Sequence, residues 1–453
     1  MSALRYSGEA AADTPSTLAA AGQASVQQPT GAVMDKRAFL KNVGMMGLAL
    51  PLNLSHIQAA VADVADRGAG SVAGDEDFWA RIRGDYDLKS DYINLENGYY
   101  CFMPQQTLER QIEHMRNVNR EGSYYMRTEQ WDNKTRVANE VATIVGCTAE
   151  EVAITRNTTE SLDLIIGGIH WEAGDEAVMA EQDYGSMLNH FEYVARRYGV
   201  VNRRVSVPNH PRDDDEIVDL YASAITDKTR LLMVCHMINI TGQILPIRKI
   251  VDMAHARGVE VMVDGAHAYS HIDFNMQDLG CDYYGTSLHK WLSAPLGSGM
   301  LYVKKEKIDT VWPLLAARDL EPNKIRRLNQ VGTHPVHVDL AILDAIDYQN
   351  AIGLERKEAR LRYLQSYWTS QVRDLPRVVV NTPAEPHRHA GIGNVGIEGM
   401  EPSVLADRLL DEHGIYTAGI DRPGVVGVRV TPNLYTTLEE LDALVAAIKA
   451  LSA

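Results

Sequence analysis

The sequence predicts an α/β protein, with a large domain built on a mostly parallel β-sheet and a smaller α+β domain at its C-terminal end. Between about residues 152 and 263, short apolar runs alternate with amphipathic helical stretches. This is the pattern of right-handed strand–helix–strand crossovers. After about residue 377 short strands mix with helices instead. The 453 residues, 45% of them hydrophobic, are enough for two or three domains.

The first 74 residues are expected to form a disordered leader. Residues 1–33 are rich in Ala, Ser, Thr, Gln and Gly and lack apolar periodicity, which is typical of a chain without fixed structure. Lys36 and Arg37 then precede an uncharged stretch from Asn42 to Ile57, the layout of a secretory signal. The stretch resembles a twin-arginine export signal and predicts a periplasmic protein. The alternative is an unstructured or amphipathic leader on a cytoplasmic protein. The apolar run is too short for the ~20 residues of a membrane span.

Residues 75–120 are expected to form an N-terminal segment that joins the small domain. The segment opens with a charged helix at 75–84 and continues as a strand at 92–100, which breaks at the Asn97-Gly98 turn. Helical spacing then runs from about 104 to 146, with an aromatic and basic loop at 123–127.

The large domain is expected at residues 121–335. Its strands are predicted at 152–155, 177–180, 200–207, 231–235, 259–263 and 300–303. One helix is predicted to begin at residue 159, and three others are predicted at 187–198, 216–225 and 247–257. The helix at 247–257 is the clearest, because Pro246 precedes it, Gly258 ends it and its apolar residues share one face.

The small C-terminal domain is expected at residues 336–453. A long helix at 340–352 ends at Gly353 and is followed by a helix rich in Arg and Glu. Short strands are predicted at 378–380 and 425–430, and a final helix begins at a cap in 436–440.

Charge and cysteine content narrow the class of function. A net charge of -16 and a pI of about 5.4 argue against broad binding to nucleic acid or anionic membranes. The four cysteines, Cys101, Cys147, Cys235 and Cys281, lack the spacing of a zinc site or a disulfide framework. A protein that acts on small molecules fits this composition best.

An acid and a lysine dominate the stretch from residue 259 to 305. Asp264 ends a short β-branched run, so it should lie at the carboxyl edge of the sheet, where ligands bind in α/β folds. Lys290 follows Ser287-Leu288-His289 and precedes a glycine-flanked strand. Pyridoxal phosphate (PLP) needs a lysine for its aldehyde, a carboxylate at its pyridine nitrogen and fixed donors for its phosphate. Lys290 and Asp264 suit the first two tasks; a surface lysine and a turn cap are the alternatives.

Two segments carry a resemblance to a known family. Asp264-Gly265-Ala266-His267-Ala268 and the run from Gly285 to Leu292 resemble the strand end and the lysine segment of class V aminotransferases, which are PLP enzymes of fold type I. The resemblance covers roughly residues 90–450. It implies the PLP-dependent transferase fold with a mostly parallel sheet of seven strands, PLP as cofactor and an amino acid as small-molecule substrate.

The resemblance also implies a phosphate site. Thr158 and Thr159 lie between a strand and a helix, where helix-start amides bind anions; a simple helix cap is the alternative. Ser287 and His289 would complete the site from the lysine side. Thr333 matches the family residue that reaches the phosphate of the neighbouring subunit, which implies a homodimer with shared active sites.

Five further residues take roles by resemblance. Tyr184 is expected to stack on the cofactor ring, because the family's usual histidine is missing from residues 181–186. Asn239 would donate to the phenolic oxygen, and His267 would pack against the other face of the ring with an open role as acid or base. Arg429 would bind the substrate α-carboxylate through two parallel hydrogen bonds, and Asn97 would meet the same group; a surface ion pair is the alternative for Arg429.

The implied reaction begins with proton removal from the α-carbon by Lys290, with Asp264 stabilising the charge through the ring nitrogen. The segment around Tyr184 resembles the isopenicillin N epimerase-like branch of the family, so epimerisation or racemisation is the first hypothesis and transamination the second. Cysteine desulfurase or lyase chemistry is disfavoured, because no cysteine follows Cys281. A protein of this fold that has lost catalysis and only binds ligands is the third hypothesis.

Overall fold

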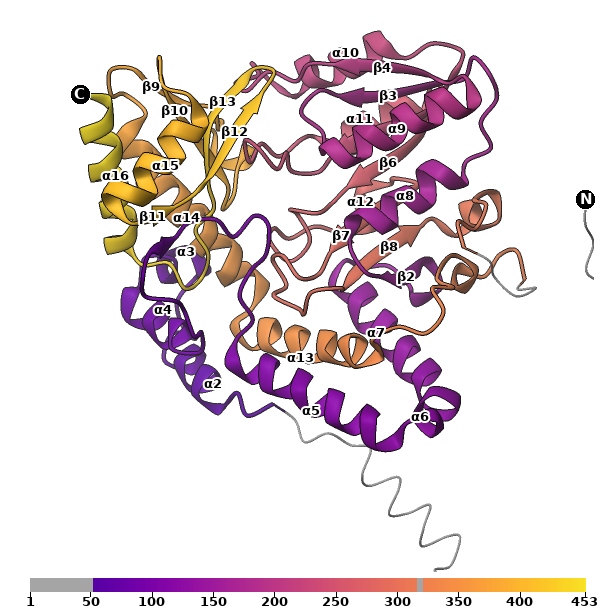
Figure 1. Cartoon of the computed structure of the whole chain (residues 1–453), viewed down its shortest axis with the longest axis horizontal. Helices are drawn as coiled ribbons and strands as arrows, with labels where there is room; N and C mark the ends of the chain where they lie inside the picture. Colours follow the sequence, from indigo (N-terminus) through magenta and orange to yellow (C-terminus); the bar gives the residue numbers. More distant parts are fainter. Residues whose placement is uncertain (1–51, 316–320) are drawn as a thin grey trace, which may run out of the picture. The chain divides into compact units, whose positions relative to one another are not determined.

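The computed structural model describes residues 52–315 and 321–453 (Figure 1). The expected disorder of residues 1–51 and most of the expected export signal, up to residue 51, lie outside these described residues.

A seven-stranded sheet forms the centre of the large domain, in the order β2-β8-β7-β6-β5-β3-β4 (Figure 1). Its strands are β2 (Val152–Thr155), β3 (Glu176–Ala180), β4 (Val201–Val205), β5 (Thr229–Cys235), β6 (Glu260–Asp264), β7 (Tyr283–Ser287) and β8 (Gly299–Val303). Only β8 runs antiparallel to its neighbours β2 and β7. The mostly parallel sheet predicted from the sequence is therefore confirmed. Strand β7 was not predicted, because its sequence YYGTS lacks an apolar run.

Helices cover both faces of this sheet. Cores form on the two faces because neighbouring strand residues point in opposite directions; Met179 lies in one core and Ala180 in the other. One face packs against α8 (Thr158–Gly168) and α9 (Gly185–Tyr198). The other packs against α7 (Gln130–Ile144), α10 (Asp214–Ala224), α11 (Ile247–His255), α12 (Met276–Leu279) and α13 (Val336–Ile352).

A smaller antiparallel sheet, in the order β12-β13-β10-β9, forms the second unit of the fold. It contains β9 (Val378–Val380), β10 (Gly393–Ile397), β12 (Ala418–Arg422) and β13 (Val425–Val430), and its core includes residues of α14 (Leu354–Val372), α15 (Pro402–His413) and α16 (Leu438–Ser452). A parallel pair of short strands, β1 (Ile93–Asn94) and β11 (Ile415–Tyr416), links the N-terminal segment to this unit. Short 3-10 helices complete the structure at Ala149–Glu151, Lys305–Thr310, Ile325–Leu328 and Pro386–Arg388.

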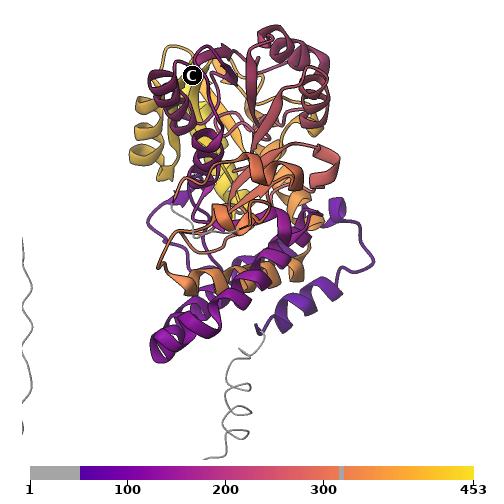
Figure 2. The ribbon, with the colours of Figure 1, turned by 90° about the vertical axis from the view of Figure 1, so that its right-hand side faces the viewer.

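Helix α13 belongs with the large sheet. It lies beside α7 and α5 (Gln105–Glu121), as Figures 1 and 2 both show. Its residues Ile342, Ala345 and Ile346 are buried in the same core as α7. The expected boundary between the large and small domains, at residues 335/336, therefore lies just before α13, although α13 packs against the large sheet.

The expected disorder up to residue 74 is wrong for residues 52–74. Helices α2 (Ser55–Ala62) and α3 (Ala69–Val72) lie there, and they pack against α4 (Glu76–Arg83). Ile57 and Ala60, three residues apart, form a buried helical face. The sequence interpretation assigned Ile57 to the apolar part of a signal instead of to a core.

The loop expected at residues 123–127 is also wrong. These residues lie within helix α6 (Ser123–Thr128), and Gly122, whose φ is +57°, separates α6 from α5. In the part of the chain that the structure describes, no helix is long and apolar enough to cross a membrane.

Candidate active site

A cavity of about 490 Å³ lies at the carboxyl edge of the large sheet. Five parallel strands, β2, β3, β5, β6 and β7, each end at or just before a residue of the cavity wall. Ten of the expected site residues line it: Thr158, Thr159, Tyr184, Asn239, Asp264, His267, Ser287, His289, Lys290 and Arg429. The strand order that brings them together is the reason why residues up to 271 positions apart share one cavity.

Lys290 follows β7 and reaches into the cavity, with its Nζ 2.9 Å from Nε2 of His267. Burial lowers the pKa of Lys290 to about 8, although the carboxylate of Asp264 acts in the opposite direction. At mildly alkaline pH a substantial share of Lys290 is therefore the free amine, the form that attacks a carbonyl or accepts a proton.

His267 is held in one tautomer by Trp291. The indole Nε1 of Trp291 donates to Nδ1 of His267 over 3.3 Å, so a neutral His267 carries its proton on Nε2 and donates it to Lys290. Burial lowers the pKa of His267 well below its usual range, and the neighbouring Lys290 adds to this effect. His271 supports the arrangement: its ring stacks on Trp291 at 3.6 Å between centroids, and its Nδ1 donates to the backbone oxygen of His267.

Asp264 is the last residue of the central strand β6, between Cys235 of β5 and Gly285 of β7. Its side chain is buried and accepts a hydrogen bond from the backbone N–H of Ala266 at 2.9 Å. Burial raises the pKa of Asp264, and the positive charge of Lys290 opposes that shift. A buried carboxylate of this kind is suited to pair with a protonated ring nitrogen.

The start of helix α8 forms an anion site. Thr158 and Ser287 bring their hydroxyl oxygens to 2.7 Å, and the backbone N–H of Thr158 also donates to Ser287. Asn157 caps the helix by accepting from the N–H of Glu160. Amides and hydroxyls at a helix start are the kinds of donor that a phosphate requires. His289 lies beside them, and burial lowers its pKa to about 4.

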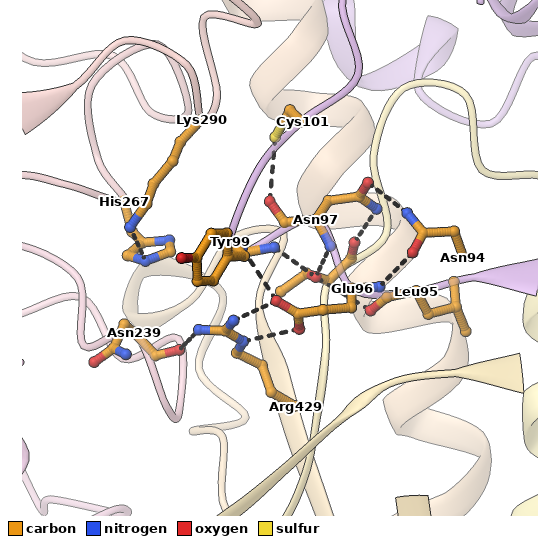
Figure 3. A network of polar contacts seen from close by, with 12 residues as sticks. Asn94, Leu95, Glu96, Asn97, Tyr99, Cys101, Asn239, His267, Lys290 and Arg429 are labelled. Atoms are coloured by element: carbon orange, nitrogen blue, oxygen red, sulfur yellow. Dashed lines mark hydrogen bonds and ion pairs between the residues drawn. The ribbon is translucent and has the colours of Figure 1, made fainter. Parts of the chain in front are cut away.

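Arg429, on β13, forms an ion pair with Glu96 (Figure 3). Its Nε donates to Oε2 of Glu96 at 3.1 Å, its Nη2 donates to Oε1 of the same carboxylate, and its Nη1 donates to the backbone oxygen of Asn239 at 3.2 Å. The guanidinium lies against Gly98, where an added Cβ would come within 2.6 Å of Cζ of Arg429. Glu96 was not predicted, because nothing in its local sequence indicates a partner 333 residues away.

Two expected residues lie outside the cavity wall. The amide of Asn97 is buried and its bonds are used inside the protein: it donates to the backbone oxygen of Thr431 at 2.6 Å and accepts from the Tyr435 hydroxyl at 2.7 Å. Asn97 is not part of the cavity wall, and the expectation that it meets the substrate stays a prediction. Thr333 is exposed and away from the cavity of its own chain. Tyr99, which was not predicted, does line the cavity and is 80% exposed.

The donors around the cavity fit PLP. A carboxylate, a lysine and a helix N-terminus stand at its wall, which are the three groups that the cofactor's ring nitrogen, aldehyde and phosphate require. Among the described residues, Oδ1 of Asn239 and Nδ1 of His289 are buried without a hydrogen-bond partner. Unpaired polar atoms at the wall of a cavity are expected where a ligand completes their hydrogen bonds.

Comparison with known proteins places the chain among its relatives. The chain is similar to isopenicillin N epimerase of Streptomyces clavuligerus, with 28% identity over 83% of this chain and 98% of the relative. Its fold is similar to a cysteine desulfurase of Thermococcus onnurineus NA1 (TM-score 0.73, 23% identity, 82% and 98% of the two chains). It is also similar to a C-DES variant with glycine covalently linked to its PLP cofactor (TM-score 0.72, 20% identity, 81% and 98%). The family model described as aminotransferase class-V matches residues 103–443. The chain therefore belongs to the class V aminotransferase family of PLP-dependent enzymes.

Proposed function

We propose that this PLP-dependent enzyme is an amino-acid epimerase or racemase, which inverts the configuration of an α-carbon. The observation that carries the proposal is the Lys290 amine, held 2.9 Å from a histidine that itself carries its proton on Nε2. The similarity to isopenicillin N epimerase over nearly that relative's whole length supports the same reaction class.

When bound, PLP draws electrons from the α-carbon and so makes its proton acidic. Lys290 would accept that proton on Nζ, and Asp264 would pair with the charge of the ring nitrogen. Thr158, Ser287 and the start of α8 would hold the phosphate. Delivery of a proton from solvent to the opposite face of the α-carbon would give inversion.

Persulfide chemistry is disfavoured by the state of the cysteines. A desulfurase needs a reactive thiolate near the substrate. Cys101, Cys235 and Cys281 are buried and Cys147 is half-buried. Burial raises the pKa of Cys101 to about 12, so this thiol stays protonated at neutral pH although it lies near Lys290. None of the four cysteines lines the cavity.

A panel of L-amino acids tests the proposal. The purified enzyme is incubated with each amino acid in deuterated water, without an oxo-acid, and the products are separated by chiral chromatography. Appearance of the D-form with deuterium at the α-carbon supports inversion. Production of an oxo-acid in stoichiometric amounts contradicts it and favours transamination, and release of sulfide from cysteine favours a desulfurase.

Lys290→Ala provides the matching control. This variant is expected to lose the visible absorption of the lysine-bound cofactor and at least about 1,000-fold of the activity, because both the covalent link and the base are removed. Lys305→Ala, which removes an exposed lysine paired with Glu150, should keep both the visible absorption and the activity. A protein that binds amino acids but leaves every one unchanged, with Lys290 intact, would favour the non-catalytic hypothesis.

We also propose that the enzyme works as a homodimer with shared active sites. Thr333 is exposed outside its own cavity, which suits a residue that contacts the site of a second copy. Tyr99, which lines the cavity, is 80% exposed, and Trp312 is 76% exposed. Large exposed apolar side chains are typical of interfaces. Light scattering of the purified protein should give about twice the chain mass of 50.2 kDa; a monomer would contradict this proposal.

The location proposed from the leader is the periplasm. The pattern of Lys36, Arg37 and the following apolar stretch supports it. Fractionation of cells that express the full chain, and of cells that express a Lys36→Gln/Arg37→Gln variant, tests this: the wild type should be periplasmic and the variant retained. Equal cytoplasmic retention of both would favour the cytoplasmic alternative.

A further inference from the structure

A second cavity, of about 330 Å³, lies beside the cavity that contains Lys290. Tyr184, Asn239 and Ile420 line both cavities, so the two share a wall. Asp264 and Lys290, which would hold the cofactor, line only the first. The second cavity therefore offers room for a part of the substrate that extends beyond the cofactor.

Side chains of both charges line this second cavity. Glu181 follows β3, and Arg422 is the last residue of β12. Within the described part of the chain, neither of them forms an ion pair, with each other or with a third side chain. Nη2 of Arg422 lies 3.6 Å from the position of a Cβ added to Gly185, so the guanidinium lies against the first residue of α9. Burial raises the pKa of Asp183, the other acid in the wall, to about 7, so its charge is partly lost at neutral pH. Opposite charges that stay apart in one cavity suit a ligand that carries both charges itself.

The turn after Arg422 is fixed to the large domain. Nε2 of Gln182 donates to the backbone oxygen of Pro423 at 3.5 Å, and Nδ2 of Asn209 donates to that of Gly424 at 2.8 Å. The two donors follow β3 and β4 of the large sheet. These hydrogen bonds hold the β12–β13 hairpin against the large domain, so the strand that carries Arg422 is fixed at the cavity wall.

The hairpin presents one arginine to each cavity. Arg429 of β13 lines the first cavity and pairs with Ala418 of β12, whereas Arg422 stands four residues further along β12 and lines the second. Because side chains alternate along a strand, Arg429, Ile420 and Arg422 share one face of the hairpin. At ~3.3 Å per residue, the Cα atoms of the two arginines are ~13 Å apart along the strands. With the α-carboxylate at Arg429, an extended side chain would point along the hairpin towards Arg422.

We infer that the second cavity is the subsite for the far end of the substrate's side chain and that this end carries two charges: Arg422 pairs with a carboxylate, and Glu181 pairs with an ammonium group. The substrate class is then the diamino dicarboxylic acids, which have an amino-acid head group at each end of one chain. This assignment rests on the proposed function, since it names the substrate of the same site. A side chain with only one of the two charges would meet a like charge without the compensating pair.

Four amino acids that differ only at the far end test this assignment on the PLP-loaded enzyme. L,L-diaminopimelate carries both groups, L-α-aminopimelate lacks the second amino group, L-lysine lacks the second carboxylate, and L-norleucine lacks both. L,L-diaminosuberate, which is one methylene longer than L,L-diaminopimelate, covers a longer reach. Each compound is titrated while the visible absorption of the lysine-bound cofactor is followed, which measures binding apart from turnover. The better of the two diamino acids should bind at least about tenfold more tightly than each of the other three compounds.

Two substitutions separate the two charges. Arg422→Gln should weaken the binding of L,L-diaminopimelate and L-α-aminopimelate about tenfold without weakening that of L-lysine. Glu181→Gln should weaken the binding of L,L-diaminopimelate and L-lysine by about the same factor without weakening that of L-α-aminopimelate. L-norleucine should bind both variants as it binds the wild type, which also shows that they are folded. Arg204→Gln and Glu192→Gln, which break an exposed ion pair outside both cavities, are the matched controls and should change none of these affinities.

Two results would overturn the subsite. If L-norleucine binds the wild type as tightly as both diamino acids, the second cavity does not receive a charged end. If L-lysine or L-α-aminopimelate binds as tightly as the better diamino acid, the site recognises a single charge. Neither result affects inversion in the amino-acid panel. Transamination of a tightly bound L,L-diaminopimelate would instead contradict the proposed function and support the subsite.

Discussion

At the scale of single residues, the position of one proton on His267 adds to the effect of burial on Lys290. Trp291 donates to Nδ1 of His267 and thereby leaves the proton on Nε2, where it faces the Lys290 amine. A protonated lysine could not accept that hydrogen bond, so the tautomer favours the neutral amine. Trp291 is therefore a positioning residue, which acts on the lysine through the histidine.

Trp291→Phe should weaken the preference of His267 for the tautomer with its proton on Nε2. The phenyl ring keeps the packing against His271 but lacks the N–H donor, so His267 is free to place its proton on Nδ1 and to accept from a charged Lys290. The apparent pKa of Lys290 should rise, and the acid limb of the kcat profile should move to higher pH. We expect kcat near neutral pH to fall by about tenfold with little change in KM, measured in the reaction found with the amino-acid panel.

A second tryptophan provides the comparison. Trp171 is also buried and its Nε1 also donates, to the backbone oxygen of Ile166, away from the cavity. Trp171→Phe should leave the pH profile unchanged. If Trp291→Phe lowers the activity at every pH without moving the profile, its role is packing alone.

At the scale of elements, α2 is the part of the fold that the sequence interpretation missed. Its residues Ile57 and Ala60 belong to an apolar cluster that also contains Trp291 and residues of α14, such as Leu361. The helix thus packs in the same apolar cluster as Trp291, which donates a hydrogen bond to His267 beside Lys290. Its eight residues carry only two buried side chains, which gives a weak helical signal beside the stronger pattern of an export signal.

Ile57→Ala is expected to destabilise the protein by about 2–5 kcal/mol, because the side chain is fully buried and its removal leaves a cavity. Chemical denaturation followed by fluorescence measures the change. Gln58→Ala, at the exposed neighbouring position, should stay within about 0.5 kcal/mol of the wild type. Equal stabilities of the Ile57→Ala variant and the wild type would mean that α2 is not part of the folded core in solution.

Prediction from sequence was most specific where the information was local. Asp264 and Lys290, which line one cavity, each stand in a short motif. Helix α11 was predicted because it has a proline before it, a glycine after it and one apolar face. Strand β7 was not predicted because its polar sequence shows no periodicity, although the strand is buried between β6 and β8. The role of Glu96 was not predicted because an ion pair between residues 333 positions apart leaves no pattern in either local sequence.

At the scale of the whole molecule, buried neutral histidines make the protein sensitive to acid. Burial lowers the pKa of five of them: His236, His267, His271, His289 and His389. Below pH 6.5 the unfolded chain takes up protons at these positions while the folded chain does not, so each histidine removes stability as the pH falls. Asp183, whose pKa burial raises to about 7, acts in the opposite direction.

His236→Leu isolates one of these contributions. Burial lowers the pKa of His236 to about 3, so between pH 6 and pH 4 the unfolded wild type binds about one more proton at this site than the folded state. The free energy of unfolding should fall less steeply with decreasing pH in the variant than in the wild type. The two slopes should differ by about 1.4 kcal/mol per pH unit. Urea denaturation at several pH values measures the slopes.

The exposed residue His413 supplies the reference for this measurement. His413→Leu should show the wild-type slope, because this side chain is exposed. A slope of His236→Leu that equals the wild-type slope would mean that His236 takes up a proton in the folded state as readily as in the unfolded chain.

The pairing of Glu96 with Arg429 also sets an order of assembly during synthesis. Glu96 belongs to the first quarter of the chain, whereas Arg429 is added 139 residues after Lys290. A ribosome that adds about 5–20 residues per second needs about 7 to 28 s for the distance from Lys290 to Arg429. For this interval the nascent chain already carries Asp264 and Lys290 but lacks the cation that pairs with Glu96. The ion pair can therefore form only when nearly the whole chain has been made.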